Sequence, residues 1–237
     1  MLITVPSMIA STMVAVDITI ANVALPHMQS SLSASQEQVL WVLTSYLVAG
    51  AIATPLSGWL AGRVGRKNVM LFSVGGFTLA SALCGLSTSL TMIVFARFLQ
   101  GAFGAALIPL SQAILLDINP PEEHAKAMAI FALGSMAGPI IGPTLGGYIT
   151  DHASWHWIFL LNVPVGVVLL MLAVPLVKDT AAYEAARKAK MADGFTIDYV
   201  GFALLALGLG CLQIMLDKGQ QNDWFDSSFI IAMTVIA

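Results

Sequence analysis

Charged residues are scarce in this sequence. Of its 237 residues, ten are Lys or Arg and thirteen are Asp or Glu, which gives a formal net charge of −3. An ordinary soluble domain contains about 25% charged residues, whereas this chain contains 10%. The few cations are scattered and form no basic surface, so a nucleic-acid partner is not expected.

Patterns for disulfides, metals and nucleotides are also lacking. The two cysteines, Cys84 and Cys211, lie in apolar runs and are predicted to be small apolar side chains. His152 and His156 have the spacing of a zinc pair but no Glu of an H-E-x-x-H motif, so no metal is expected. No Gly-rich phosphate loop or nucleophile cluster is visible, which disfavours ATP use, a cofactor and a membrane-embedded enzyme.

Hydrophobic residues dominate instead. They make up 58% of the chain, and the mean hydropathy is +0.86. A globular core cannot hide so much apolar surface, so lipid must surround most of the chain. A spanning helix needs about 20 apolar residues. Apolar runs of about this length, separated by polar or charged residues, predict seven complete spans. They cover residues 2–28, 39–61, 68–88, 91–115, 125–149, 156–177 and 197–216.

Both ends of the chain carry apolar runs. Residues 1–28 lack the basic region and cleavage site of a secretory signal, so we expect a retained first helix. The last run, residues 227–237, has about half the length of a span, so we expect the chain to stop inside an eighth helix.

The cations indicate an orientation. If the N-terminus is cytoplasmic, only Lys218 falls in an outer loop and Arg97 in a span, and the inner side receives Arg63, Arg66, Lys67, Lys126, Lys178, Arg187, Lys188 and Lys190. Inner loops of membrane proteins are enriched in Lys and Arg. The sequence therefore predicts a multi-pass protein with a cytoplasmic N-terminus.

Residues 178–196 form the one long charged segment and divide the chain. Six spans precede it in residues 1–177, and extra helices follow in residues 197–237. Glu184 and Lys188 have helical i,i+4 spacing, which predicts a short amphipathic helix on the inner membrane surface. A solvated linker is the alternative. Within 1–177, similar Pro/Gly patterns near Pro55 and Pro143 favour an inverted repeat of three helices, as in secondary transporters.

Two charged residues, Asp17 and Arg97, fall well inside apolar runs. Each costs at least about 2.5–3.5 kcal/mol at the bilayer centre. With the outer face near Met28 and Thr91, a rise of about 1.5 Å per residue places Asp17 about 16 Å deep and Arg97 about 9 Å deep. An Arg side chain covers that difference. The pair is either a structural salt bridge or a proton site at which Asp17 gains and loses a proton beside Arg97.

Uncharged polar residues also lie inside the spans. Gln100 is one turn after Arg97 and shares its face, whereas Asn22 is five residues from Asp17 and points elsewhere. Candidates for the lining of a substrate cavity are Asn22, Gln100 and Gln112, with Thr19 nearby. Bonding between neighbouring helices is the alternative for each of them.

Glycine recurs every four residues along the fifth span, at Gly134, Gly138, Gly142 and Gly146, and Pro139 and Pro143 each follow a glycine. Four residues advance about 400°, so the glycines form one slowly turning smooth stripe. The stripe predicts close approach of another helix, and the prolines permit a bend. The open alternatives are ordinary tight packing and a seam between helices that rearrange.

An inner turn follows the second span, where residues 58–67 read G-W-L-A-G-R-V-G-R-K. This segment resembles the inner-loop signature of the major facilitator superfamily, G-x-L-A-D-R-x-G-R-K, and departs from it at Gly62, where the family has Asp. The matching site residues are Gly58, Arg63, Gly65, Arg66 and Lys67. In the family that Asp links the loop to a neighbouring helix end, so Gly62 puts the full charge relay in doubt.

The resemblance extends along the chain. Residues 17–26 (D-I-T-I-A-N-V-A-L-P) resemble the first-helix signature of drug/proton antiporters with fourteen spanning helices. Residues 97–101 resemble the R-x-x-Q-G motif linked to proton transfer, and residues 134–147 resemble the antiporter motif of helix five. Residues 155–164 resemble the EmrB branch of these antiporters. The resemblance implies an all-α major facilitator fold: the N-terminal six-helix bundle, a 3+3 inverted repeat, plus additional helices.

The resemblance also implies a function. Members of this family export lipophilic or cationic toxic compounds across the inner membrane in exchange for protons, with the proton gradient as energy source. The EmrB branch implies a periplasmic adaptor and an outer-membrane channel as partners. The alternatives are a non-transporting sensor or assembly subunit, or a facilitator for a specific metabolite.

Overall fold

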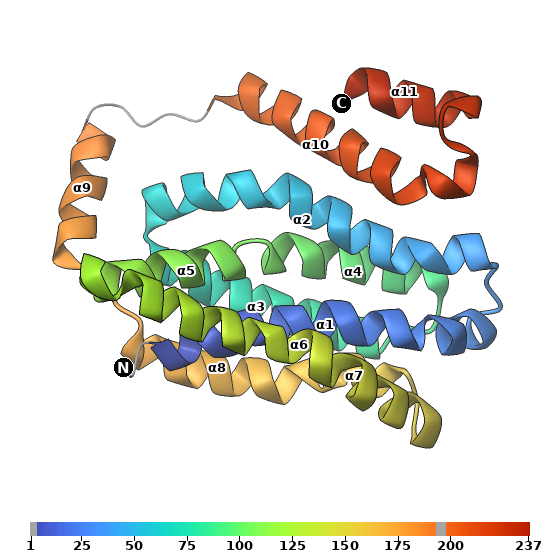
Figure 1. Cartoon of the computed structure of the whole chain (residues 1–237), viewed down its shortest axis with the longest axis horizontal. Coiled ribbons are helices and arrows are strands. Elements are labelled where there is room, and N and C mark those ends of the chain that lie inside the picture. The colour runs from blue at the N-terminus through green and yellow to red at the C-terminus, as the bar shows by residue number, and fades with distance from the viewer. Residues whose placement is uncertain (1–3, 193–197) are drawn as a thin grey trace.

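A computed structural model describes residues 4–192 and 198–237, and the ordered elements within these ranges are helices. Figure 1 shows long helices running side by side along one direction. The α-helices are α1 (Thr4–Ser31), α2 (Gln36–Val64), α3 (Arg66–Gly85), α4 (Leu90–Gly104), α5 (Leu107–Ile118), α6 (His124–His152), α7 (His156–Leu160), α8 (Asn162–Leu176), α9 (Ala181–Ala192), α10 (Tyr199–Lys218) and α11 (Ser228–Ile236). Three 3₁₀ turns cover Pro121–Glu123, Gln220–Asn222 and Trp224–Asp226.

Seven helical units in the described ranges are long and apolar enough to cross a membrane. They are α1, α2, α3, α4 with α5, α6 with its preceding 3₁₀ turn, α7 with α8, and α10. Their number and order confirm the seven predicted spans. The ends of two predicted spans, residues 2–3 and 197, lie outside the described residues. Helix α11 has 9 residues, too few to cross.

Two predicted spans are each divided into two helices. The fourth is interrupted between α4 and α5, and the sixth between α7 and α8. In each case the interruption lies about four residues before a proline, Pro109 or Pro164. Proline has no N–H to donate to the carbonyl four residues earlier, at Ala105 and Leu160 respectively. The helix therefore loses one hydrogen bond at each place.

The bundle core consists of two apolar clusters. One gathers residues such as Val74, Phe77 and Leu169, and the other gathers residues such as Ile93 and Phe159. Helix α1 runs through both, and its Asp17 lies between the part that packs in the first cluster and the part that packs in the second. A polar layer therefore separates two apolar halves of the core.

The segment after α8 leaves the bundle. Helix α9 lies across one end of it, at a steep angle to the spanning helices, and α10 and α11 lie on the far side of α2 (Figure 1). Helix α9 carries no buried residue. A helix is thus present within the predicted linker, of which residues 193–196 lie outside the described residues. Its position on the membrane surface stays a prediction.

The end of the bundle beside α9 also holds the turns after α2 and α5 and the end of α8 (Figure 1). The eight cations assigned to the inner side by sequence lie in or next to these segments. Lys218, at the end of α10, lies at the other end. The charge asymmetry is therefore a property of the folded bundle, although it leaves the direction of insertion as a prediction.

Candidate functional site

Asp17 of α1 and Arg97 of α4 meet inside the bundle. The Arg97 guanidinium nitrogen Nη1 donates to Asp17 Oδ2 at 2.5 Å, and both residues are 0% exposed. The two are 80 positions apart in sequence. The two charges in the spans thus form a buried ion pair, which agrees with the membrane depths expected from the sequence.

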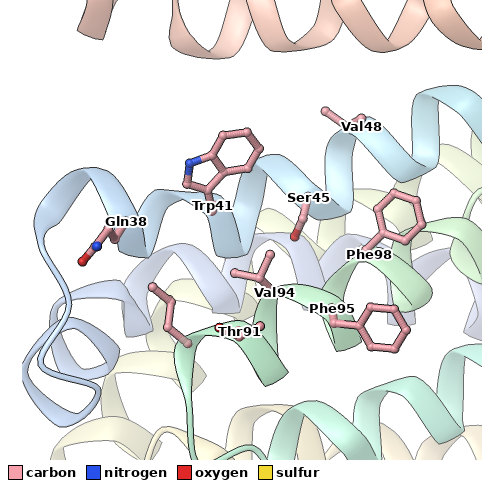
Figure 2. Close-up of a pocket in the computed structure, with 9 residues that line it drawn as sticks. Gln38, Trp41, Ser45, Val48, Thr91, Val94, Phe95 and Phe98 are labelled. Atoms are coloured by element: carbon pink, nitrogen blue, oxygen red, sulfur yellow. The ribbon is translucent and has the colours of Figure 1, made fainter.

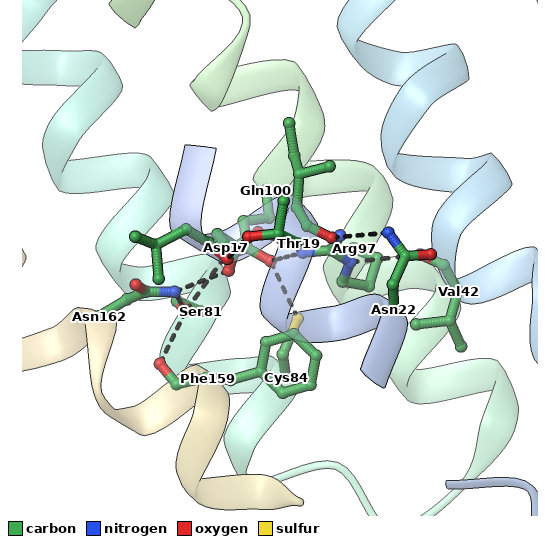
Figure 3. A network of polar contacts seen from close by, with 12 residues as sticks. Asp17, Thr19, Asn22, Val42, Ser81, Cys84, Arg97, Gln100, Phe159 and Asn162 are labelled. Atoms are coloured by element: carbon green, nitrogen blue, oxygen red, sulfur yellow. Dashed lines mark hydrogen bonds and ion pairs between the residues drawn. The ribbon is translucent and has the colours of Figure 1, made fainter. Parts of the chain in front are cut away.

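Three uncharged side chains extend the ion pair into a polar network (Figure 3). Gln100 Nε2 and Asn162 Nδ2 both donate to Asp17 Oδ1, at 2.9 and 2.7 Å. The same two amide nitrogens lie 3.1 and 3.0 Å from the hydroxyl of Ser81, which itself donates to the Phe159 carbonyl at 2.8 Å. Helices α1, α3, α4 and α8 are thus tied together by one polar network.

Arg97 has further partners besides Asp17. Its Nε donates to the Val42 carbonyl at 3.2 Å, and Nη1 also donates to Gln100 Oε1 at 2.8 Å. The guanidinium carbon lies 4.2 Å from the centre of the Tyr46 ring, within cation–π range. Arg97 therefore keeps attractive partners even if Asp17 loses its charge.

A glycine lets α4 come close enough to α2 for these contacts. A Cβ atom added to Gly101 would lie 2.2 Å from the Tyr46 carbonyl oxygen, a distance no side chain tolerates. Because Gly101 has no Cβ, α4 packs directly on the α2 backbone, and Arg97 one turn earlier reaches the Val42 carbonyl. This contact gives the glycine of the R-F-L-Q-G segment a structural role.

The candidates Asn22 and Gln112 form no hydrogen bond with the ion pair among the described residues. Asn22 is exposed, and its amide donates to the Ile18 carbonyl in its own helix at 3.1 Å. Gln112 is half-buried on α5. Gln100 is 0% exposed and belongs to the polar network, so in this conformation it supports Asp17 and lines no open cavity.

The glycine stripe of α6 packs on α1. A Cβ on Gly138 would lie 2.6 Å from Ala15 Cβ, and one on Gly142 would lie 2.9 Å from Thr19 Cβ. Thr19 also donates across the seam to the Gly138 carbonyl at 3.1 Å. Pro139 and Pro143 are exposed on the other side of α6. The stripe therefore forms a close seam between two helices of the same bundle.

Gly134 and Gly146 extend that seam in both directions. A Cβ on Gly134 would meet Met8 at 2.8 Å, and one on Gly146 would meet Ile20 at 2.7 Å. The Thr12 hydroxyl donates to the Gly134 carbonyl at 3.0 Å. Close packing, one of the two interpretations of the stripe, is present along its whole length; whether the seam rearranges stays a prediction.

The inner-loop motif lies at the end of the bundle beside α9. Gly65 makes the turn between α2 and α3 with a φ of 95°, which favours glycine. Arg66 pairs with Asp117 at the end of α5, and its guanidinium lies 4.1 Å from the Tyr183 ring centre. Lys67 Nζ donates to the Val174 carbonyl at 2.7 Å. Most of the motif thus holds helix ends together.

Gly58 and Arg63 take less part in these contacts. A Cβ on Gly58 would meet nothing within 4 Å, and Arg63 is exposed with its guanidinium 5.3 Å from the Trp59 ring centre.

An aspartate from outside the motif serves this turn. Asp179, between α8 and α9, accepts a hydrogen bond from the Lys67 backbone N–H at 3.1 Å, at the N-terminus of α3 where a carboxylate is favourable. Tyr183 of α9 donates to the Ala61 carbonyl at 2.7 Å. Partial burial raises the pKa of the Tyr183 hydroxyl, and the Arg66 guanidinium acts in the opposite direction. Carboxylates at Asp117 and Asp179 therefore anchor the loop although position 62 is Gly.

Several apolar grooves open on the surface of the bundle, and two of them lie beside α1 or α2. The first, the α2–α4 groove, lies between α2 and α4 and is lined by Trp41, Val94, Phe95 and Phe98 with Gln38, Ser45, Val48, Leu90 and Thr91 (Figure 2). The second lies between α1, α6 and α8 and reaches Asn162 of the polar network. Small lipophilic molecules suit both linings.

These features define a class of protein. A bundle of spanning helices with a buried, fully bonded ion pair and glycine-rich helix contacts is typical of secondary membrane transporters. The chain belongs to the major facilitator superfamily, whose family model matches residues 7–236. Membership of this transporter family also agrees with the expectation that the chain is not an enzyme, and it confirms the resemblance seen in the inner-loop motif.

Known relatives narrow the family. The chain is 44% identical over 236 residues to the multidrug export protein EmrB of Escherichia coli strain K12, covering 100% of this chain and 44% of that protein. It is 38% identical over 231 residues to the fatty acid resistance protein FarB of Neisseria gonorrhoeae, covering 97% of this chain and 44% of that protein. The chain thus spans less than half the length of these relatives.

Solved structures share the fold at low identity. The xylose transporter XylE from E. coli, in a partially occluded inward-open conformation, gives a TM-score of 0.71 at 16% identity, covering 93% of this chain and 60% of that one. The peptide transporter POT in complex with sulfate gives a TM-score of 0.66 at 15% identity, covering 90% and 50%. The all-α major facilitator fold is thereby confirmed.

Proposed function

We propose that this chain is the N-terminal part of a proton-coupled exporter of lipophilic or cationic toxic compounds, acting as a secondary active antiporter. The names of its relatives, a multidrug export protein and a fatty acid resistance protein, support the substrate class. The observation that carries the proposal is the buried Asp17–Arg97 pair inside the polar network.

The proton step takes place at Asp17. In the charged state its carboxylate accepts hydrogen bonds from Arg97, Gln100 and Asn162. A proton that binds one carboxylate oxygen removes the negative charge and turns an acceptor into a donor, which weakens the bond from Arg97. Arg97 stays charged and keeps Val42, Gln100 and Tyr46 as partners. The network therefore has two arrangements that differ by one proton.

Protonation of Asp17 is coupled to movement of the helices around it. In secondary transporters two halves rock about a site near the bilayer centre. Asp17 lies on α1, and the glycine seam joins α1 to α6 over its length. A shift of α1 on protonation is therefore passed to α6, and we propose that the two helices move as one unit against the remaining half of the exporter.

The charge distribution and the resemblance to known exporters support a membrane location, an orientation and partner proteins. We propose insertion in the inner membrane with the N-terminus cytoplasmic, because the cation-rich end of the bundle then faces the cytoplasm. A periplasmic adaptor and an outer-membrane channel are the proposed partners, from the resemblance to the EmrB branch. The proton gradient supplies the energy.

A transport assay tests the proposal. The full-length protein is reconstituted in liposomes with an acidic lumen, and accumulation of a fluorescent lipophilic cation is followed. Antiport predicts accumulation that stops when an ionophore collapses the pH gradient. Asp17→Asn removes the proton site and is expected to abolish gradient-driven accumulation.

Glu184→Gln is the matched control, because it removes an exposed carboxylate on α9, outside the network. It is expected to transport like the unmodified protein. Gradient-driven accumulation by the Asp17→Asn protein would contradict the proton-site assignment. A protein that accumulates no probe with or without a gradient would instead be a sensor or assembly subunit.

A further inference from the structure

The apolar groove between α1, α6 and α8 differs from the α2–α4 groove because its lining includes Asn162, a residue of the polar network. It is lined by three helices and has a volume of about 540 Å³, within the roughly 300–1,000 Å³ of sites for drug-sized ligands. Its walls include Met13 and Val16 of α1, Leu145 of α6 and Val165 of α8, and its polar lining residues are Thr12 and Asn162. We call it the Asn162 groove.

Charge complementarity limits its occupant. The residues that line the Asn162 groove include no Asp, Glu, Lys, Arg or His. The Thr12 hydroxyl is already donated to the Gly134 carbonyl at 3.0 Å. An ionic ligand would find no counter-charge there and would lose its hydration, which is costly in a low-dielectric site. The lining therefore suits a neutral, lipophilic molecule.

Asn162 supplies a directional contact that Thr12 cannot replace, because Asn162 also bonds to Asp17. The residue is 4% exposed, and its amide nitrogen is engaged with Asp17 and Ser81. Figure 3 shows the amide nitrogen turned toward Asp17 and the amide oxygen on the opposite side. Among the described residues, no hydrogen bond to that oxygen accompanies the two that the amide nitrogen makes, and Asn162 belongs to the lining of the groove, so a ligand there can donate to it. The groove thus presents an amide acceptor next to the proton site, and the Thr12 hydroxyl oxygen further along the lining.

The same side chain connects the groove to the proton site. A donor bound to the amide oxygen polarises the amide and strengthens the N–H bond that Asn162 gives to Asp17 Oδ1 at 2.7 Å. This favours the carboxylate over the protonated acid, as an antiporter needs when substrate binding must release a proton. The α2–α4 groove has no lining residue in the polar network, so it lacks this connection.

We propose that the Asn162 groove binds neutral lipophilic molecules that carry a hydrogen-bond donor, and that Asn162 is the residue through which their binding reaches Asp17. The inference rests on the proposed export function for its biological meaning, and its binding step stands on the groove alone. A lipid acyl chain would fill the walls and leave the amide oxygen without a donor, so the presence of a donor decides between the two occupants.

Two matched probes test the proposal on the full-length protein in detergent. 4-Octylphenol has one O–H donor, and 4-octylanisole replaces it with a methyl ether of similar size and apolarity. Calorimetric titration is expected to show at least tenfold tighter binding of the phenol. Equal affinities would overturn the proposal and would assign the groove to acyl chains.

A pair of variants locates the binding. Val165→Phe fills the groove from α8, and Val168→Phe places the same side chain on the exposed face of that helix. The first is expected to weaken phenol binding at least tenfold and the second to leave it unchanged. Unchanged binding in Val165→Phe, with the phenol preference intact, would overturn the assignment to this groove.

The outcome is separable from that of the export proposal. If the proteoliposomes show no gradient-driven transport but the phenol preference and its loss in Val165→Phe are found, the export function fails and the groove assignment holds. If transport of a lipophilic cation is normal and the phenol binds no better than its ether, the groove assignment fails and the export function holds.

Discussion

Gly138→Ala is a sharp test of the seam between α1 and α6. The added Cβ would lie 2.6 Å from Ala15 Cβ, 2.7 Å from the Ala15 carbonyl carbon and 2.8 Å from the Val16 nitrogen. Two of these are backbone atoms, which cannot rotate away. Ordinary contact begins at 3.4 Å, so the helices must separate by about 0.8 Å at this point.

The cost follows from that separation. Overpacking of a close contact costs about 1–3 kcal/mol. The hydrogen bond from Thr19 to the Gly138 carbonyl, 3.1 Å long, is stretched at the same time, and such a bond contributes about 0.5–1.5 kcal/mol. Gly147→Ala on the same helix meets its nearest neighbour, Val23, only at 4.0 Å. The gain in helix propensity is common to both variants and cancels, so they should differ by about 1.5–4.5 kcal/mol.

Unfolding of both variants in mixed detergent micelles, followed by tryptophan fluorescence, measures that difference. The expected order of stability is Gly147→Ala above the unmodified protein and Gly138→Ala below it. Gly138→Ala with a stability equal to that of Gly147→Ala would show that α6 does not pack on α1 through its glycines. The account of the seam would then be wrong.

Three further predictions concern the ion pair and the inner turn. Asp17→Asn and Arg97→Gln should each destabilise by about 3–5 kcal/mol, and the double variant by clearly less than their sum; additive unfolding free energies would refute the pairing. Gly65→Ala should cost about 1–3 kcal/mol, because φ is 95° and ψ is 149° and the Cβ would lie 2.5 Å from Asp179 Oδ2; an unchanged unfolding free energy would contradict this. Tyr183→Phe loses its bond to the Ala61 carbonyl, worth about 0.5–1.5 kcal/mol, so limited proteolysis within α9 should speed up about two- to tenfold, and an unchanged rate would place α9 free of the bundle.

The spans and the ion pair could be predicted because the physical signals are strong. Long apolar runs have one solution in lipid, the helix, and α1, α2, α3, α6 and α10 begin and end close to the limits of those runs. Asp17 and Arg97 were the two charges in the spans, so each was the partner available to the other.

The rest of the network could not be predicted from sequence spacing. Ser81 and Asn162 are small polar residues of kinds that are common in membrane helices and usually bond locally. Asn162 bonds to Asp17 across 145 residues of sequence, and Ser81 joins the network through Gln100 and Asn162. Both contacts depend on how α3 and α8 pack in the bundle. The one available signal was an amide in an otherwise apolar run, just before Pro164.

The inner turn gives a similar lesson. The motif residues predicted a basic turn, but the replacement of the family's Asp by Gly62 pointed to a weakened charge relay. In the structure, Asp117 and Asp179 supply carboxylates to this turn. Asp179 accepts a hydrogen bond from the backbone N–H of Lys67, which is 112 residues earlier in the sequence. A charged residue in a linker shows no sequence sign of such a role, because its partner is set by where the chain returns to the bundle.

Substrate-induced proton release tests the central claim most directly. The full-length protein is placed in weakly buffered detergent solution with a pH-indicator dye, and a saturating lipophilic substrate is added. The account predicts release of up to about one proton per bound substrate from the unmodified protein and none from Asp17→Asn at equal substrate occupancy. Equal proton release from both proteins would contradict it.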